Sequence, residues 1–315
     1  MQNTISRRSL LLCLGAGSVF QSRAEAPTSL DFVHLSDTHV IDPTGVHPKL
    51  IQMRAMFAHT RTALPADLAV FRRDWRAAFA FVTGDLIDVY SFLGADGAVV
   101  TGQVEAFARI VTRSPLLIYP GLGNHDVQHY GLTSDGRLAP DQSNVEQAKA
   151  AWIRSVPAFR DGTYYAFHRE VGGTQWRFIM LNNGFYGHLP DPTRRPPEHG
   201  LGRWQADWLT AHCRQYPDAP LVLGAHIPPA GAALAEIEQA LGVRTKMTVL
   251  FTGHIHKSDF VKQLPFANAR AYHVATPGYA TGRAHFRRVR LHPDRIELFG
   301  TGKSDEIAQA VPIQG

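Results

Sequence analysis

The stretch VLFTGHIHKSD, residues Val249–Asp259, joins a run of apolar residues to two histidines. The run Met247–Thr252 has the length and composition of a buried β-strand, and Gly253 follows it. His254 and His256 are separated by one residue, so in an extended segment both imidazoles point to the same side. Imidazole is a common metal ligand, but this short pattern also occurs in ordinary surface turns. A metal site therefore needs further ligands from elsewhere in the chain.

Apolar runs of strand length recur along the chain, and segments with helical spacing of apolar residues lie between several of them. The expected strands are Phe32–Leu35, Phe79–Thr83, Leu116–Tyr119, Phe178–Leu181, Leu221–Leu223 and Met247–Thr252. The expected helices are Gln103–Thr112, Val145–Val156, Arg203–Arg214 and Ala232–Leu241. Alternation of strands and helices indicates an α/β fold. After about Ala271 the pattern becomes all-β, so we expect additional antiparallel strands at the C-terminus of a single domain.

The segments between these elements predict two tight turns and three long loops. Turns are expected at Gly172–Gly173 and at His292–Asp294, each between two strands. Three stretches lack a clear period: Ile41–Leu64, Val127–Asn144 and Gly184–Gly202. Loops of this length in a compact domain are usually functional.

Asp, Asn or His residues follow five of the expected strands. The motifs are SDTH with Asp37 and His39, GDLID with Asp85 and Asp88, GNHD with Asn124, His125 and Asp126, AHIPP with His226, and GHIH with His254 and His256. Ligands of open α/β sheets bind beyond the carboxyl ends of the strands. Each motif alone is compatible with an ordinary turn or helix start, but five strand exits of this kind favour one shared site.

In this order, the motifs resemble those of the calcineurin-like metallophosphoesterase superfamily, and they span Asp37 to His256. The resemblance implies a four-layer α/β/β/α sandwich with two metal ions at the edge of its sheets. It implies one ion bound by Asp37, His39, Asp85 and His256, and a second bound by Asp85, Asn124, His226 and His254. Asp85 would bridge the two ions.

The resemblance also implies the roles of two further residues. His125 would act as general acid, or as charge stabiliser, at the leaving oxygen. Such a histidine needs a partner that orients it, and Asp88 matches the family residue in that role, with Asp126 as the alternative.

Two metal ions with these ligands would suit the hydrolysis of phosphate esters. Two carboxylates do not cancel the charge of two divalent ions, so the site would attract an anionic ester and stabilise its transition state. A bridging hydroxide would be the nucleophile, and no Ser or Cys nucleophile is needed. Asp, Asn and His ligands suit divalent or trivalent metal ions, and the candidates are Zn, Mn, Fe and Co.

Departures from related subgroups narrow the expected substrate. Purple acid phosphatases have Tyr in place of Asp88 and lack His39, and Ser/Thr protein phosphatases have Arg in place of Val89. The pattern resembles bacterial class III cyclic-nucleotide and glycerophosphodiester phosphodiesterases, so we expect phosphodiesters as substrates. A phosphomonoesterase and a non-catalytic metal-bearing interaction module are the alternatives. Residues expected to shape the substrate pocket are His129, Tyr130, Tyr186, His188, Arg194 and Arg195, although the two arginines also fit a solvated turn.

The N-terminus has the pattern of an export signal. The apolar run Leu10–Phe20 is too short to span a membrane, and small residues follow it at Ser22, Ala24 and Ala26. Arg7 and Arg8 directly precede it, as in bacterial twin-arginine signals. We therefore expect a signal peptide over residues 1–24, a metallophosphoesterase domain over residues 25–315, export by the Tat machinery and a periplasmic or secreted location. An ordinary Sec signal is the alternative.

The composition fits a globular protein with a hydrophobic core, since 44% of the 315 residues are hydrophobic and 19% are charged. No apolar stretch is long enough to span a membrane, so we expect no membrane span. Cleavage after Ala24 would remove Arg7, Arg8 and Arg23 but no acidic residue, so the formal charge of +5 would fall to about +2. The sequence shows no nucleic-acid-binding pattern. Cys13 would leave with the signal, so Cys213 could form no internal disulfide.

Overall fold

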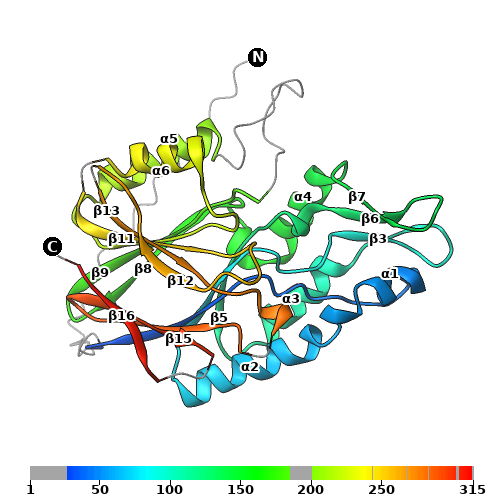
Figure 1. The fold of residues 1–315 in the computed structure, drawn as a ribbon, viewed down its shortest axis with the longest axis horizontal. Helices are drawn as coiled ribbons and strands as arrows, with labels where there is room; N and C mark the ends of the chain where they lie inside the picture. Colours follow the sequence, from blue (N-terminus) through cyan, green and yellow to red (C-terminus); the bar gives the residue numbers. More distant parts are fainter. Residues whose placement is uncertain are drawn as a thin grey trace, which may run out of the picture.

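The computed structural model describes residues 27–184 and 201–313, except 243, 268, 283 and 303–304. Two six-stranded sheets pack face to face, and helices cover both outer faces (Figure 1). The first sheet has the order β16 (Ile307–Pro312), β15 (Arg295–Thr301), β14 (Arg287–Leu291), β1 (Leu30–Leu35), β2 (Phe79–Thr83), β5 (Leu117–Gly121). The second has the order β12 (Phe260–Gln263), β13 (Ala269–Ala275), β11 (Arg244–Thr252), β10 (Leu221–Gly224), β9 (Thr174–Met180), β8 (Tyr165–Val171). The expected α/β sandwich is confirmed.

Each sheet combines a block of parallel strands with antiparallel strands that extend it. In the first sheet β1, β2 and β5 run in the same direction, and β14, β15 and β16 extend the sheet as the expected C-terminal antiparallel strands. In the second sheet β9, β10, β11 and β13 are parallel. Within each sheet, the carboxyl ends of these strands lie at one edge, where the five motifs follow.

The space between the sheets is filled largely by phenylalanines. Phe32 of β1 lies 5.6 Å, between ring centroids, from Phe178 of β9, and Phe81 of β2 lies 5.9 Å from the same ring. Alternate residues of the same strands, such as Val33, face the helices instead, because successive side chains of a strand point to opposite faces. Burial of each such phenylalanine stabilises the sandwich by about 1.5–3 kcal/mol.

Helices cover the two outer faces as the apolar patterns predict. The first sheet is covered by α2 (Thr60–Asp74), α3 (Gln103–Arg113) and α4 (Val145–Ser155). The second is covered by α5 (Arg203–Gln215) and α6 (Gly231–Leu241). The four expected helices begin and end within one or two residues of the predicted bounds, and both predicted turns are present. No helix within the described residues is long and apolar enough to cross a bilayer.

Two of the three predicted loops contain regular structure, so those predictions were wrong. The stretch Ile41–Leu64 contains α1 (Pro48–Met53), the 3-10 helix η1 (Ala55–Phe57) and the start of α2. Its apolar period is masked by basic residues and by Pro65 inside α2. The third stretch, Gly184–Gly202, lies almost entirely outside the described residues.

The stretch Val127–Asn144 contains strands of a third sheet. This sheet has the order β4 (Val99–Val100), β3 (Ser91–Leu93), β6 (His129–Leu132), β7 (Leu138–Asp141) and projects beside the sandwich together with α1 (Figure 1). Its strands are short and contain turn-forming residues such as Gly131 and Pro140, which conceal the strand pattern.

Two buried histidines are held neutral by the fold. Burial, followed by the charge of Arg287, lowers the pKa of His34 to about 3. Burial, followed by the charge of Lys262, lowers the pKa of His273 in β13 to about 4, and its Nε2 lies 2.7 Å from Oγ1 of Thr252. An unfolded histidine has a pKa near 6.5. The unfolded chain therefore binds protons before the folded chain does, and stability falls as the pH drops from about 6.5 towards 4.

Replacing His273 should reduce this pH dependence. We expect metal-free His273→Gln protein to lose about 2–3 kcal/mol less free energy of unfolding than the wild type between pH 7 and pH 4.5. Urea unfolding at several pH values measures the difference. His168→Gln, at an exposed position of β8, is the control and should follow the wild-type profile. Parallel profiles for His273→Gln and the wild type would contradict the assignment.

Candidate metal centre

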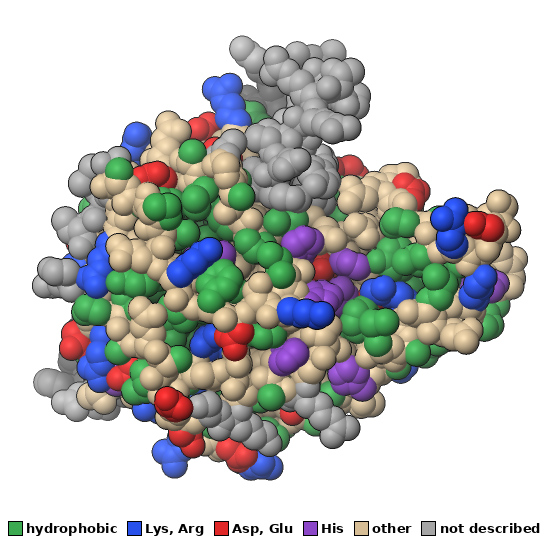
Figure 2. Space-filling view, viewed as in Figure 1, with side chains coloured by type: hydrophobic (Ala, Val, Ile, Leu, Met, Phe, Trp, Pro, Cys, Tyr) green, Lys and Arg blue, Asp and Glu red, His purple; other side chains and the backbone are tan. Residues whose placement is uncertain are grey.

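The loops that follow the parallel strands bring the predicted ligands together at the edge of the sandwich. Figure 2 shows histidine side chains gathered in the middle of one face of the molecule. One group contains Asp37, His39, Asp85 and His256, and a second contains Asp85, His226 and His254. Within each group, one donor atom of every residue lies within 4.8 Å of the others. Asp85 belongs to both groups, as a bridging ligand would.

The separations between donor atoms resemble the edges of a coordination shell. Nε2 of His256 lies 3.2 Å from Oδ1 of Asp37 and 3.2 Å from Nε2 of His39. Nε2 of His226 lies 3.2 Å from Oδ2 of Asp85 and 3.1 Å from Oδ1 of Asn124, which joins Asn124 to the second group. Ligands bound at about 2.0–2.2 Å from one metal ion have similar separations.

An unsatisfied oxygen in the first group supports the fit to a cation. Oδ1 of Asp37 is buried and has no hydrogen-bond partner among the described residues, although Nε2 of His256 is near it. Buried carboxylate oxygens normally have such partners, because an unsatisfied one is costly. A metal ion between Asp37, His39 and His256 would satisfy this oxygen.

The second group favours a positive charge between its donors. Nδ1–H of His226 donates to the carbonyl of Thr83 at 2.8 Å, so its Nε2 faces the oxygens of Asp85 and Asn124. Burial alone would lower the pKa of His226, but the Asp85 carboxylate outweighs it and raises this pKa to about 9. The pKa of Asp85 is held well below its usual range: burial opposes this, but the charges of His226 and His125 outweigh it. A metal ion would supply the same stabilisation without a proton.

The backbone is strained where it presents several donors. Asp37, His39, Asp85 and His254 have positive φ angles of 53°, 41°, 49° and 66°. Such angles are uncommon for residues other than glycine and cost about 1–3 kcal/mol each. Hydrogen bonds hold three of them: Asp37 N–H to Gly84 at 3.0 Å, His39 N–H to Asp85 at 2.9 Å, and His254 N–H to Oδ2 of Asp37 at 3.1 Å. Strain concentrated at these positions is typical of a functional site.

Glycines permit the close approach of the loops. A Cβ at Gly253 would lie 1.5 Å from Oγ of Ser36, and one at Gly123 would lie 2.2 Å from Oδ1 of Asp85. The glycines of the GHIH and GNHD motifs are therefore required by packing against the neighbouring loops.

His125 points one ring nitrogen at the shared carboxylate. Its Nδ1–H donates to the main-chain carbonyl of Asp88 at 2.8 Å, and the hydroxyl of Tyr130 lies 2.9 Å from the same nitrogen. Its Nε2 lies 3.9 Å from Oδ2 of Asp85 and thus faces the centre. Burial is the main cause of a lowered pKa of His125, which Asp85 partly opposes.

The Asp88 carboxylate has different partners from those expected. It receives Nε and Nη2 of Arg54 at 2.8 and 2.5 Å, and its Oδ1 lies 3.2 Å from Nδ1 of His39. Asp88 therefore orients His125 through its main-chain carbonyl, because Arg54 draws the carboxylate towards His39. The carboxylate of Asp126 accepts from N–H of Gly123 at 2.7 Å and Ile87 at 3.0 Å, so it braces two loops.

Two residues that support the centre were missed by the motif search. Arg54 lies in a stretch that was predicted to be irregular, and no motif includes it. Oδ1 of Asn183 accepts from N–H of His226 at 3.0 Å and Ile227 at 3.1 Å. Asn183 follows β9, so the rule of polar residues at strand exits could have found it.

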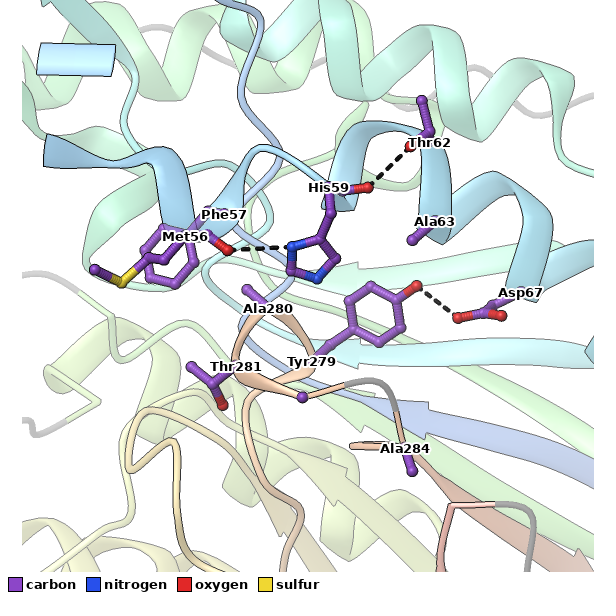
Figure 3. A pocket seen from close by; sticks show the side chains of 11 residues that line it. Met56, Phe57, His59, Thr62, Ala63, Asp67, Tyr279, Ala280, Thr281 and Ala284 are labelled. Atoms are coloured by element: carbon purple, nitrogen blue, oxygen red, sulfur yellow. Dashed lines mark hydrogen bonds between the residues drawn. The ribbon is translucent and has the colours of Figure 1, made fainter. Parts of the chain in front are cut away.

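A groove of about 1090 Å³ lies beside the first donor group (Figure 3). Its wall includes Phe57, whose ring stacks on the imidazole of His39 with centroids 4.5 Å apart. Ala280 also lines it and donates its N–H to the carbonyl of Asp37 at 3.0 Å. The hydroxyl of Tyr279, next to Ala280, donates to Asp67 of α2 at 2.7 Å and so joins the two segments that line the groove (Figure 3).

Of the residues expected to shape the substrate pocket, the two in the described part of the chain, His129 and Tyr130, do not line this groove. Tyr130 is buried against His125, and His129 lies in β6 with Nδ1 3.0 Å from Oγ of Ser91. The others lie outside the described residues: Tyr186, His188, Arg194 and Arg195.

Comparison with known proteins gives two solved structures of similar fold. A dimetal phosphatase from Danio rerio is 14% identical, with a TM-score of 0.59 over 91% of this chain and 99% of its own. GAP50 of Plasmodium, described as the anchor in the inner membrane complex, is 12% identical, with a TM-score of 0.51 over 91% of this chain and 89% of its own. No curated protein matches. At these identities, the structural similarity shows the fold alone.

The sequence profile of the calcineurin-like phosphoesterases matches residues 30–258. The match covers most of the chain and includes all five motifs whose side chains meet at the edge of the sandwich. The chain therefore belongs to the calcineurin-like phosphoesterase family, with a plausible two-metal site.

Proposed function

We propose that this protein hydrolyses phosphate esters at a two-metal centre and prefers phosphodiesters to phosphomonoesters. The observation that carries the proposal is the pair of donor groups that share Asp85. One ion would be held by Asp37, His39, Asp85 and His256, and the other by Asp85, Asn124, His226 and His254. When bound, the ions would supply Lewis acidity and a water nucleophile. The Asp, Asn and His donors suit Zn, Mn, Fe or Co.

The chain's own residues would position the ester and stabilise its charge. Asn124 and the imidazoles are neutral ligands, so they do not reduce the positive charge that attracts a phosphate. Nε2 of His125 faces the centre and would donate to the leaving oxygen. Burial lowers the pKa of His125, but the negative charge of a bound ester beside it would favour the protonated imidazole.

The preference for diesters rests on the resemblance of the motifs to those of bacterial phosphodiesterases. The groove approaches the first donor group through Phe57 and Ala280, although none of the donors lines it, and it could hold the substituent that a diester retains and a monoester lacks. A phosphomonoesterase that uses the same centre is the alternative.

A non-catalytic role on the same fold is a less favoured alternative. GAP50, whose structure has a similar fold, is described as an anchor, and this description is the observation behind the alternative. The complete set of donors here, together with His125 facing them, favours catalysis.

The role of His125 can be tested with leaving groups of different acidity. We expect His125→Ala to lower kcat by about 10²–10⁴ for esters of poor leaving groups and by less for nitrophenyl esters, which need little protonation. Metal content should remain near that of the wild type. An equal loss for good and poor leaving groups would instead favour simple charge stabilisation by His125.

Matched esters test the proposed substrate class. We expect a higher kcat/KM for bis(nitrophenyl) phosphate than for nitrophenyl phosphate. Ala63→Trp, which narrows the groove, should lower kcat/KM about tenfold for the diester and leave the monoester nearly unchanged. Ala66→Trp, at an exposed position of the same helix, is the control. A higher kcat/KM for the monoester would leave phosphomonoesterase as the better function.

Export by the Tat machinery to the periplasm or beyond is part of the proposal. It is supported by Arg7 and Arg8 before the apolar run; residues 1–26 lie outside the described part of the chain. Changing both arginines to lysine should leave the protein in the cytoplasm, which fractionation measures. Wild-type levels of the double variant outside the cytoplasm would contradict Tat export.

A further inference from the structure

Arg54 binds the carboxylate of Asp88 in the GDLID motif, although Arg54 itself lies outside every motif. It follows α1, and its side chain is only 15% exposed. Its Nε and Nη2 donate to the two oxygens of Asp88 at 2.8 and 2.5 Å, and Asp88 is fully buried. Two parallel charge-assisted hydrogen bonds of this kind fix the orientation of a carboxylate as well as neutralise it.

The guanidinium of Arg54 is packed between aromatic rings. Its central carbon lies 4.7 Å from the ring centroid of Phe57 and 5.4 Å from that of Tyr130. Phe57 in turn stacks on the imidazole of His39, at an angle of 11° between the planes. Arg54, Asp88 and Phe57 thus surround the side of His39 that faces away from the other donors.

His39 needs such support in order to bind a metal ion through Nε2. Nε2 points at His256 and Asp85, whereas Nδ1 is buried and makes no hydrogen bond within the described residues. The nearest acceptor to Nδ1 is Oδ1 of Asp88, at 3.2 Å, so a small rotation of either side chain would form that bond. An acceptor beside Nδ1 keeps the proton on that nitrogen and leaves the lone pair of Nε2 for the metal ion. Loss of such a partner typically reduces metal affinity 10–100-fold.

We propose that Arg54 is a positioning residue that holds the Asp88 carboxylate against His39 and thereby sets the affinity of one metal position, the one formed by Asp37, His39, Asp85 and His256. The proposal rests on the two-metal function proposed above. Asp88 occupies two of the guanidinium nitrogens and the rings enclose the group, so the geometry favours this role over direct contact with a phosphate. Lysine could not replace it fully, because an ammonium lacks the planar fork and stacks less well.

The test measures zinc binding to metal-free protein by competition with a chelator, so it does not depend on activity. We expect Arg54→Met, which keeps an unbranched stem but removes the guanidinium, to weaken one of the two zinc sites about 10–100-fold and to leave the other unchanged. Arg54→Lys should weaken the same site less. Asp88→Asn should also weaken zinc binding at this site. If both residues act through the same contact, the double variant Arg54→Met/Asp88→Asn should bind zinc there as tightly as the single variant with the lower affinity.

The control is Arg61→Met, which removes a half-exposed arginine of α2 that is paired with Asp42. It should leave both zinc affinities at the wild-type values. If Arg54→Met does not fold, Arg54→Lys carries the same comparison between the two sites.

Three results would overturn the proposal. Equal weakening of both zinc sites would show a general structural role for Arg54. Unchanged zinc affinities with a raised KM for the ester would show that Arg54 contacts the substrate. If the wild type binds two zinc ions and Arg54→Met binds both with wild-type affinity, the positioning role is refuted, but the proposed function remains intact. By contrast, fewer than two ions in the wild type would contradict the proposed function itself.

Discussion

The buried carboxylate of Asp85 is the constraint on which the arrangement of the centre depends. It is 1% exposed, and its Oδ1 accepts from the main-chain N–H of His125 at 2.9 Å. Its Oδ2 lies 3.2 Å from His226 and 3.7 Å from His39, which belong to different donor groups. A buried charge is tolerated only with compensating positive charge or strong hydrogen bonds. Two cations beside Asp85 would provide that compensation and would place their own charges where a phosphate ester binds.

The fold delivers the remaining donors to Asp85 from both sheets. Because β1, β2 and β5 are parallel, the turns after them meet at one edge, and β10 and β11 bring His226, His254 and His256 to the same place. The phenylalanine-filled core fixes the spacing of the sheets, and positive φ angles turn the chain sharply at the donors. Stability gained in the core thus offsets strain at the edge.

Much of the fold and the meeting of the motifs could be predicted from the sequence, because both depend on local patterns. Phe79–Thr83 reads as a buried strand with the predicted bounds, and the polar residues after it mark the functional edge. The side-chain direction of Asp88 could not be predicted, since it depends on Arg54, 34 residues away in a stretch without a motif. The third sheet was missed because its strands are short and its turn-forming residues resemble a loop. The groove is formed by η1, α2 and the segment around Tyr279, which no local pattern connects.

The most direct test is a crystal structure of metal-loaded protein with anomalous diffraction measured at the absorption edge of the bound metal. The two-metal account predicts two anomalous peaks about 3.5–4 Å apart, with the Asp85 carboxylate in contact with both. The peak beside His39 and His256 and the peak beside Asn124, His226 and His254 should be separate. A single peak, or two peaks of which only one touches Asp85, would contradict it.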